Sequence, residues 1–160
     1  MVRWLFQFLL TLALSLWVGS IAFFSAVMAP GIFAALERPA AGNLLSQLLP
    51  RYYRVGALCG GVALGVLLLL FLFDSGSRGL RFFQSALVIF MLAGTLYAGW
   101  LLEPRVHQLR RERTTAPSRL QRDEAERRFE NLHARSVRLN VGVLSLGAAA
   151  LGTLAVRKKS

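Results

Sequence analysis

Four apolar runs, each long enough to cross a lipid bilayer, constrain what this chain can fold into. They cover residues 4–28, 55–73, 80–102 and 139–156, and the second contains no charged residue. A helix needs about 20 predominantly apolar residues to cross a hydrocarbon core of about 30 Å. A cleaved signal peptide is the alternative for the first run, but that run is too long, and Pro30 follows its only small-residue cleavage candidate. The sequence therefore predicts an all-α bundle of four transmembrane helices, forming a single integral membrane domain over residues 1–160.

Composition and charge favour the same class of protein. Hydrophobic residues make up 55 % of the 160 residues, against about 45–50 % in soluble domains. The net charge of +11 could indicate a nucleic-acid partner, but the basic residues flank the apolar runs, as membrane-edge anchors do. No nucleic-acid partner is therefore expected. The single cysteine, Cys59, lies inside the second apolar run, so one chain can form neither a disulfide framework nor a CxxC metal site.

The segments that flank the apolar runs predict further helical structure. Residues 43–50 have apolar side chains at helical spacing and end at Pro50, which predicts a short interfacial helix between the first two spans. Pro104 lacks a backbone donor, so a kink is expected where the third helix leaves the membrane. Ser118 and Gln121 have the spacing of a capping box. The expected helices cover about 4–29, 52–73, 80–102 with an extension to 113, and 118–156.

Small residues on the first two transmembrane helices indicate close helix packing. Gln7, Thr11, Ser15 and Gly19 recur every four residues, and we expect this stripe to face neighbouring helices. The second helix has two GxxxG spacings, Gly56 with Gly60 and Gly61 with Gly65. This motif occurs both within one protomer and between copies. The glycine-rich helix is therefore also a candidate surface for a homo-oligomer.

Residues 103–138 form a charged arm with ten arginines and six acidic residues. A helix on each side of a turn near Ala116 would make a helical hairpin that protrudes from the membrane between the third and fourth spans. Four crossings place thirteen basic residues on the side of the arm and six on the side of the termini. The positive-inside rule then puts the arm in the cytoplasm, at a bacterial inner (plasma) membrane. We also expect the basic arm to prefer anionic lipid.

Polar side chains gather where this arm enters the membrane. Phe129, His133, Ser136 and Asn140 fall on one narrow face of a helix. If the hairpin turns near Ala116 and both arms are continuous helix, His133 lies at the level of residues 99–100. The third helix then supplies two further polar groups about one turn nearer the solvent. The predicted cluster consists of Glu103, Arg105, His133, Ser136 and Asn140.

This cluster has two interpretations. Ionisable groups inside a membrane commonly mark ligand, proton or ion pathways. Glutamate, histidine and asparagine can equally satisfy one another and fasten the third helix to the fourth. The remaining histidine, His107, is expected to be a solvated surface residue.

Five short motifs, in this order and spacing, resemble one family. They are Leu16-Trp17-Val18-Gly19, Ala29-Pro30-Gly31-Ile32-Phe33, Leu49-Pro50-Arg51-Tyr52-Tyr53, Trp100-Leu101-Leu102-Glu103-Pro104-Arg105, and Phe129-Glu130-Asn131-Leu132-His133 followed by Ser136 and Asn140. The set is similar to the transmembrane protein 205-like family, also called domain of unknown function 4149. This resemblance implies a four-helix membrane protein and supplies no catalytic residue. The family that the chain resembles includes an animal relative associated with platinum-drug resistance and a bacterial branch with no assigned role.

Three hypotheses for function follow. The leading one is a non-enzymatic membrane packing or interaction unit, or a small transporter-like module, with no cofactor and no metal. The alternative is a proton-coupled, metal or small-molecule permeation protein that uses Glu103, His133 and Asn140. A third is a membrane enzyme or cofactor holder that uses His107 and His133. It is disfavoured because no further histidine or thiolate supports a metal or haem site, and no nucleophile or phosphate-loop motif is present.

Overall fold

The computed structural model describes residues 2–73, 78–115 and 118–156. Within these ranges the chain is helical except at Leu36, Glu37 and Ser118, and it contains no strand. Four helical segments are long and apolar enough to cross a membrane, namely Val2–Ala35, Arg38–Phe73, Arg78–Glu112 and Arg119–Ala155. This confirms the expected all-helical architecture with four spans. The expected turn near Ala116 and the basic segment 157–160 lie outside the described residues.

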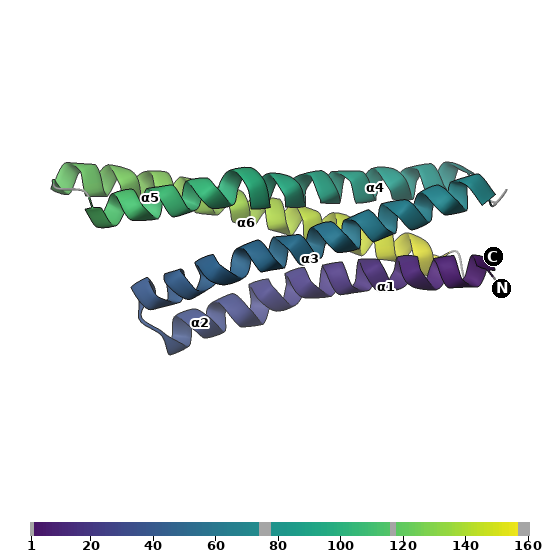
Figure 1. Ribbon diagram of the computed structural model, residues 1–160, viewed down its shortest axis with the longest axis horizontal. Coiled ribbons are helices and arrows are strands. Elements are labelled where there is room, and N and C mark those ends of the chain that lie inside the picture. The colour runs from purple at the N-terminus through teal and green to yellow at the C-terminus, as the bar shows by residue number, and fades with distance from the viewer. Residues whose placement is uncertain (1, 74–77, 116–117, 157–160) are drawn as a thin grey trace.

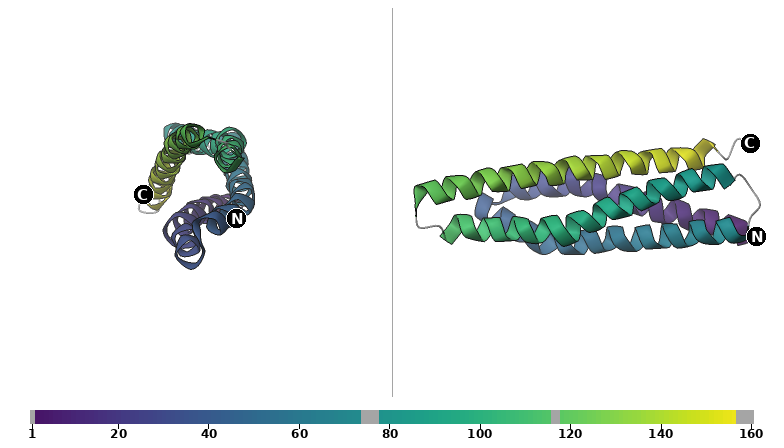
Figure 2. Two further views of the ribbon diagram at one scale, coloured as in Figure 1. Left: turned by 90° about the vertical axis from the view of Figure 1, so that its left-hand side faces the viewer. Right: turned by 90° about the horizontal axis from the view of Figure 1, so that it is seen from above.

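The four segments run alternately up and down, with both ends of the chain at one end of the bundle (Figure 1). The elements are α1 Val2–Phe23, η1 Phe24–Met28, α2 Ala29–Ala35, α3 Arg38–Phe73, α4 Arg78–Tyr97, η2 Ala98–Leu102, α5 Glu103–Thr115 and α6 Arg119–Val156. Helix α1 packs against α3 and α6, and α4 packs against the same two helices. Helices α5 and α6 lie side by side and extend past α2 and α3 at the end away from the termini (Figures 1 and 2).

Two prolines sit inside continuous helical segments rather than ending them. Pro30 and Pro104 are each the second residue after a π-helical turn, η1 and η2 respectively. In these wider turns the Ala29 N–H donates to the Phe24 carbonyl and the Glu103 N–H donates to the Ala98 carbonyl. A proline ring clashes with the carbonyl four residues earlier in an α-helix, and a single π-helical turn changes that register. The expected helix end at residue 29 is therefore wrong, and a π-helical turn precedes Pro104, where a kink was expected.

Pro50 likewise lies within α3, which runs without interruption from Arg38 to Phe73. The prediction of a separate short helix ending at Pro50 is wrong. A proline removes only one backbone hydrogen bond, and α3 has buried residues on both sides of it, among them Ala41 and Leu45 before and Tyr53 after. Packing of one continuous face therefore outweighs the local interruption.

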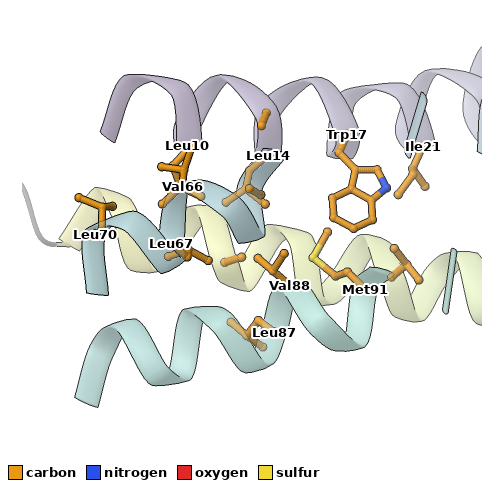
Figure 3. Packing of buried hydrophobic residues seen from close by; sticks show 14 residues of the cluster. Leu10, Leu14, Trp17, Ile21, Val66, Leu67, Leu70, Leu87, Val88 and Met91 are labelled. Atoms are coloured by element: carbon orange, nitrogen blue, oxygen red, sulfur yellow. The ribbon is translucent and has the colours of Figure 1, made fainter. Parts of the chain in front are cut away.

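The core is organised around Trp17, of which only 1 % is exposed. Its indole lies against α3 where a β-carbon on Gly56 or on Gly60 would come within 2.8 Å of the ring. The first GxxxG spacing is thus used for packing within the protomer. Leucines, valines and Met91 from α1, α3 and α4 belong to the same buried cluster as Trp17 (Figure 3). A β-carbon on Gly61 or Gly65 would meet no atom within 4 Å, and a homo-oligomer through that face stays a prediction.

The polar stripe on the first helix does not face the core. Thr11, Ser15 and Gly19 are exposed, while Leu10, Leu14 and Trp17 are buried. The Thr11 hydroxyl donates to the Gln7 carbonyl at 2.8 Å. Because the hydroxyl is satisfied within its own helix, it can face outward, so the expectation that this stripe contacts neighbouring helices is wrong.

Adjacent glycines on α3 give a matched test of this packing. We expect Gly60→Ala to lower the thermal stability of the detergent-solubilised protein, because its β-carbon would lie 2.8 Å from both the Trp17 ring and Leu92 Cδ1. Overpacking of this kind costs about 1–3 kcal/mol. The control is Gly61→Ala, which makes the same chemical change on the open face. Equal melting temperatures for the two variants would contradict the proposed packing of Trp17 against Gly60.

Candidate functional site

The site is built around Tyr53, which α3 holds against the η2 turn. A β-carbon on Gly99 would lie 2.9 Å from the Tyr53 β-carbon, so only glycine leaves room for this close approach. Tyr53 is 7 % exposed and packs with Ala98 and Leu102. Its hydroxyl lies within reach of the side chains of Ser136 and Asn140, both on α6, and interacts with both. Tyr53 therefore connects α3 to α6 across the third segment.

Glu103, the first residue of α5, lies beside the Tyr53 side chain and interacts with it electrostatically. Its carboxylate is 11 % exposed, and Oε1 lies 2.6 Å from Nε2 of His107, one helical turn further on. Oε1 is buried, and this contact is not aligned as a hydrogen bond. A carboxylate oxygen and an imidazole nitrogen are both acceptors unless one of them carries a proton. A proton on Nε2 of His107 would therefore lie between the two side chains.

Arg110, one turn beyond His107, closes the site at its outer end. Its Nη1 donates to the backbone carbonyl of Gly42 near the start of α3. A β-carbon on Gly42 would lie 2.8 Å from the Arg110 guanidinium carbon. The same guanidinium lies 5.8 Å from the centre of the Phe129 ring, a distance typical of a cation–π contact. Arg110 thus joins α5 to α3 and to α6.

These residues surround a small cavity of about 50 Å³. Its walls come from Ser46, Leu49 and Tyr53 on α3, Glu103, Val106, His107 and Arg110 on α5, and His133 and Ser136 on α6. A water molecule occupies about 30 Å³ of liquid. The space is therefore on the scale of one or two water molecules.

The structure brings together four of the five predicted cluster residues. Glu103, His133 and Ser136 line the cavity, and Asn140 reaches it through Tyr53. His133 is exposed on its outer side and stacks on Phe129, with ring centres 6.1 Å apart. Arg105 is the exception, because it is exposed and lies on the opposite side of α5, in a cleft with α6.

The structure puts Glu103 and His133 on the wall of the same cavity. On α4 and α6, a β-carbon on Gly94 would meet Val143 and Leu139, so these two helices pack closely. The expected difference in level between Glu103 and His133 was calculated from a tip near Ala116, which lies outside the described residues, and it stays a prediction.

Sequence reasoning missed three participants. His107 was expected to be a solvated surface residue, but it pairs with Glu103, and the i, i+4 spacing is a signal that could have shown it. Tyr53 was expected only as part of a family motif, and no local pattern links it to α6. Arg110 was one of ten arginines in the arm, and only the fold distinguishes it. Ser118, in contrast, accepts from the Gln121 N–H at 3.3 Å, as half of the expected capping box requires.

A second polar group lies at the other end of the bundle. Arg81 is fully buried and donates through Nη1 to the carbonyl of Leu70. Gln84, one turn further, donates through Nε2 to Thr153 Oγ1 at 2.9 Å. These contacts tie α4 to α3 and α6 near the termini. Within the described residues no group of three or more histidine, cysteine, aspartate or glutamate side chains could hold a metal ion.

Comparison with known protein families identifies the family of this chain. The family described as Domain of unknown function (DUF4149) matches residues 12–115. The chain belongs to this family. The match includes Trp17, Gly19, Pro30, Pro50, Tyr53, Trp100, Glu103 and Pro104, and it ends before the predicted Phe129 motif on α6. No curated protein and no solved structure matches the chain, so the name transmembrane protein 205-like stays a resemblance.

The Tyr53 hydroxyl can be tested by removing only that group. We expect Tyr53→Phe to lower thermal stability in detergent, since Ser136 and Asn140 lose a shared partner. The phenylalanine ring would still pack against Gly99. Leaving buried polar groups unsatisfied costs about 1–3 kcal/mol. Tyr97→Phe, on a residue that is 46 % exposed, is the matched control. If Tyr53→Phe melts at the temperature of the control, the hydroxyl does not fasten α3 to α6.

Proposed function

We propose that this DUF4149 protein is a non-enzymatic, multi-pass membrane protein that presents the basic hairpin α5–α6 at the membrane surface in a fixed position. The four apolar segments would cross the bilayer, and the hairpin would protrude from the side opposite the termini. In this arrangement the polar cluster serves to fasten the hairpin to the bundle. The protein would act as a membrane interaction unit whose basic surface meets its partners from a defined orientation.

The attachment of the hairpin at two separate levels of α3 is the observation that supports this proposal. The inner attachment joins Tyr53 to Ser136 and Asn140, and the outer one joins the Gly42 carbonyl to Arg110. Residues 42 and 53 are eleven positions apart on one helix, or about 16 Å at 1.5 Å per residue. Two attachments at this separation prevent the hairpin from pivoting on α3, which a single hydrogen bond could not do.

The size and contents of the cavity favour fastening over transport. The space between the helices is about 50 Å³, and α3, α5 and α6 all contribute polar side chains to it. Polar contacts between helices are one way to join them where hydrophobic association is weak. Tight packing of this kind suits a fixed joint.

Proton-coupled permeation is the second candidate, and the contact between Glu103 and His107 is the observation that favours it. Ionisable side chains in contact inside a membrane commonly mark proton pathways, and Oε1 of Glu103 lies 2.6 Å from Nε2 of His107. In liposomes, a proton flux that is lost in Glu103→Gln while thermal stability is kept would establish this function instead. A flux indistinguishable from that of empty liposomes would exclude it.

Hydrogen exchange tests the fixed hairpin directly. In nanodiscs of neutral phosphatidylcholine, we expect Arg110→Gln to increase amide exchange about tenfold in α5 and in residues 38–46, because a hydrogen bond from a charged group is worth about 1.5–3 kcal/mol. Exchange in α1 and α4 should stay unchanged. Arg105→Gln removes the same charge from the opposite face of α5 and serves as the control. Equal protection in both variants would show that Arg110 does not fix the hairpin.

The proposed placement also has a topological test. In a Cys59→Ala background, Leu120→Cys would mark the hairpin and Ser160→Cys the C-terminal side. If the hairpin faces the cytoplasm of a bacterial inner membrane, a membrane-impermeant maleimide should label Ser160→Cys in spheroplasts and Leu120→Cys only after permeabilisation. The reverse pattern would keep four spans and overturn the orientation. Labelling of both positions from one side would overturn the four spans.

A further inference from the structure

Helix α5 has two polar faces, and only one of them contacts the bundle. Glu103, His107 and Arg110 face the cavity shared with α3. Arg105, Gln108 and Glu112 lie on the other side and, with α6, line a separate open cleft of about 570 Å³. The proposed fastening of the hairpin uses the first face and leaves the second without a role.

This cleft carries an excess of positive charge. Arg105 comes from α5, and Arg128 and Arg135 come from α6, against the single carboxylate of Glu112. Glu112 Oε1 accepts from Gln108 Nε2 at 2.9 Å. The Arg128 guanidinium is paired with Glu124, outside the cleft. Across the described part of the chain, neither Arg105 nor Arg135 has a hydrogen bond or an ion pair through its side chain. Two exposed guanidinium groups therefore line one cleft without a protein counter-ion.

The position of these two arginines matches the level of lipid headgroups. Arg105 is three residues beyond Leu102, the last buried residue of η2, which is about 4.5 Å along a helix. Arg135 precedes Leu139, the start of the fourth apolar run, by four residues, or about 6 Å. The headgroup region adds about 5–8 Å to each side of the hydrocarbon core. Arg128 lies two turns further out. Both arginines without a counter-ion thus fall within the headgroup layer if the apolar runs span the core.

The chemistry of the cleft selects the ligand. Guanidinium groups bind phosphate oxygens through paired, charge-assisted hydrogen bonds. At the level of the headgroups, the phosphate of a membrane lipid can reach Arg105 and Arg135 while its acyl chains stay in the hydrocarbon core. This position favours a molecule with a phosphate at one end and a hydrocarbon at the other.

We propose that the cleft between α5 and α6 binds the phosphate of one anionic phospholipid through Arg105 and Arg135. This inference rests on the placement of the hairpin at the membrane surface that is proposed above. It goes further in naming a site, its two anchoring residues and its ligand class. Bound lipid would join both arms of the hairpin at the point where they enter the membrane.

Titration of the full chain in neutral detergent micelles tests this site. Phosphatidylglycerol is added at increasing mole fraction, and the melting temperature is recorded. A ligand that binds the folded state raises this temperature in a saturable manner. We expect saturation for the wild type and an apparent affinity at least about tenfold weaker in Arg105→Gln/Arg135→Gln, which loses two charge-assisted contacts. Arg119→Gln/Arg127→Gln removes the same charge from exposed positions of the hairpin outside the cleft and should bind like the wild type.

The comparison arms separate the other possible ligands. Phosphatidylcholine should give no saturable rise, and neither should inorganic phosphate or an oligoglutamate peptide at the same concentration. Equal weakening in both double variants would show that only general charge matters and would overturn the site. Saturation with inorganic phosphate or with the peptide would overturn the assignment to lipid. Melting temperatures without lipid report whether each variant is folded. Because no bilayer is present, a failed titration leaves the result of the maleimide labelling unaffected.

Discussion

The contact between the Tyr53 ring and the backbone at Gly99 is the constraint on which the polar end of this protein depends. It brings α3 close enough to η2 for the tyrosine hydroxyl to pass the third segment and meet α6. Any side chain at position 99 would push the two helices apart and remove the phenol from Ser136 and Asn140. In a membrane, where association of helices gains little from hydrophobicity, such close approach and the hydrogen bonds it allows hold helices together.

The same principle organises the apolar end in a different way. Gly56 and Gly60 accept the Trp17 indole as Gly99 accepts Tyr53. Glycine on one helix thus pairs with a large aromatic residue from another in both places, and α3 takes part in both. Leucines and valines fill the remaining space, and the exposed apolar side chains of all four segments are left for lipid. Each aromatic contact thus belongs to its own cluster of buried residues, a large one with Trp17 and a small one with Tyr53.

The architecture could be predicted from the sequence because a membrane span is recognised from about 20 consecutive apolar residues and not from any single one. The length and apolarity of the four runs gave their number and approximate places. The helix ends were harder, because Pro30, Pro50 and Pro104 look locally like breaks, whereas packing and π-helical turns carry the helices past them.

The candidate site was predictable only in part. Glu103, Ser136 and Asn140 were found because each is a polar residue next to an apolar run. Tyr53 and Arg110 could not be found in this way, since their partners are Asn140 on α6 and Gly42 on α3, far away in the chain. Arg105 was assigned to the cluster because it is close to Glu103 in the chain, although two residues that are two positions apart on a helix lie on nearly opposite faces. His107 is different, since its spacing from Glu103 was available.

A double-mutant cycle between Tyr53→Phe and Asn140→Ala measures the central link of this account most directly. Unfolding free energies of the wild type, the two single variants and the double variant would be compared in the same detergent. Residues in direct contact couple by about 0.5–3 kcal/mol, and we expect a coupling in this range, with the double variant less destabilised than the sum of the singles. Additive effects, with a coupling near zero, would contradict the proposed fastening of α3 to α6.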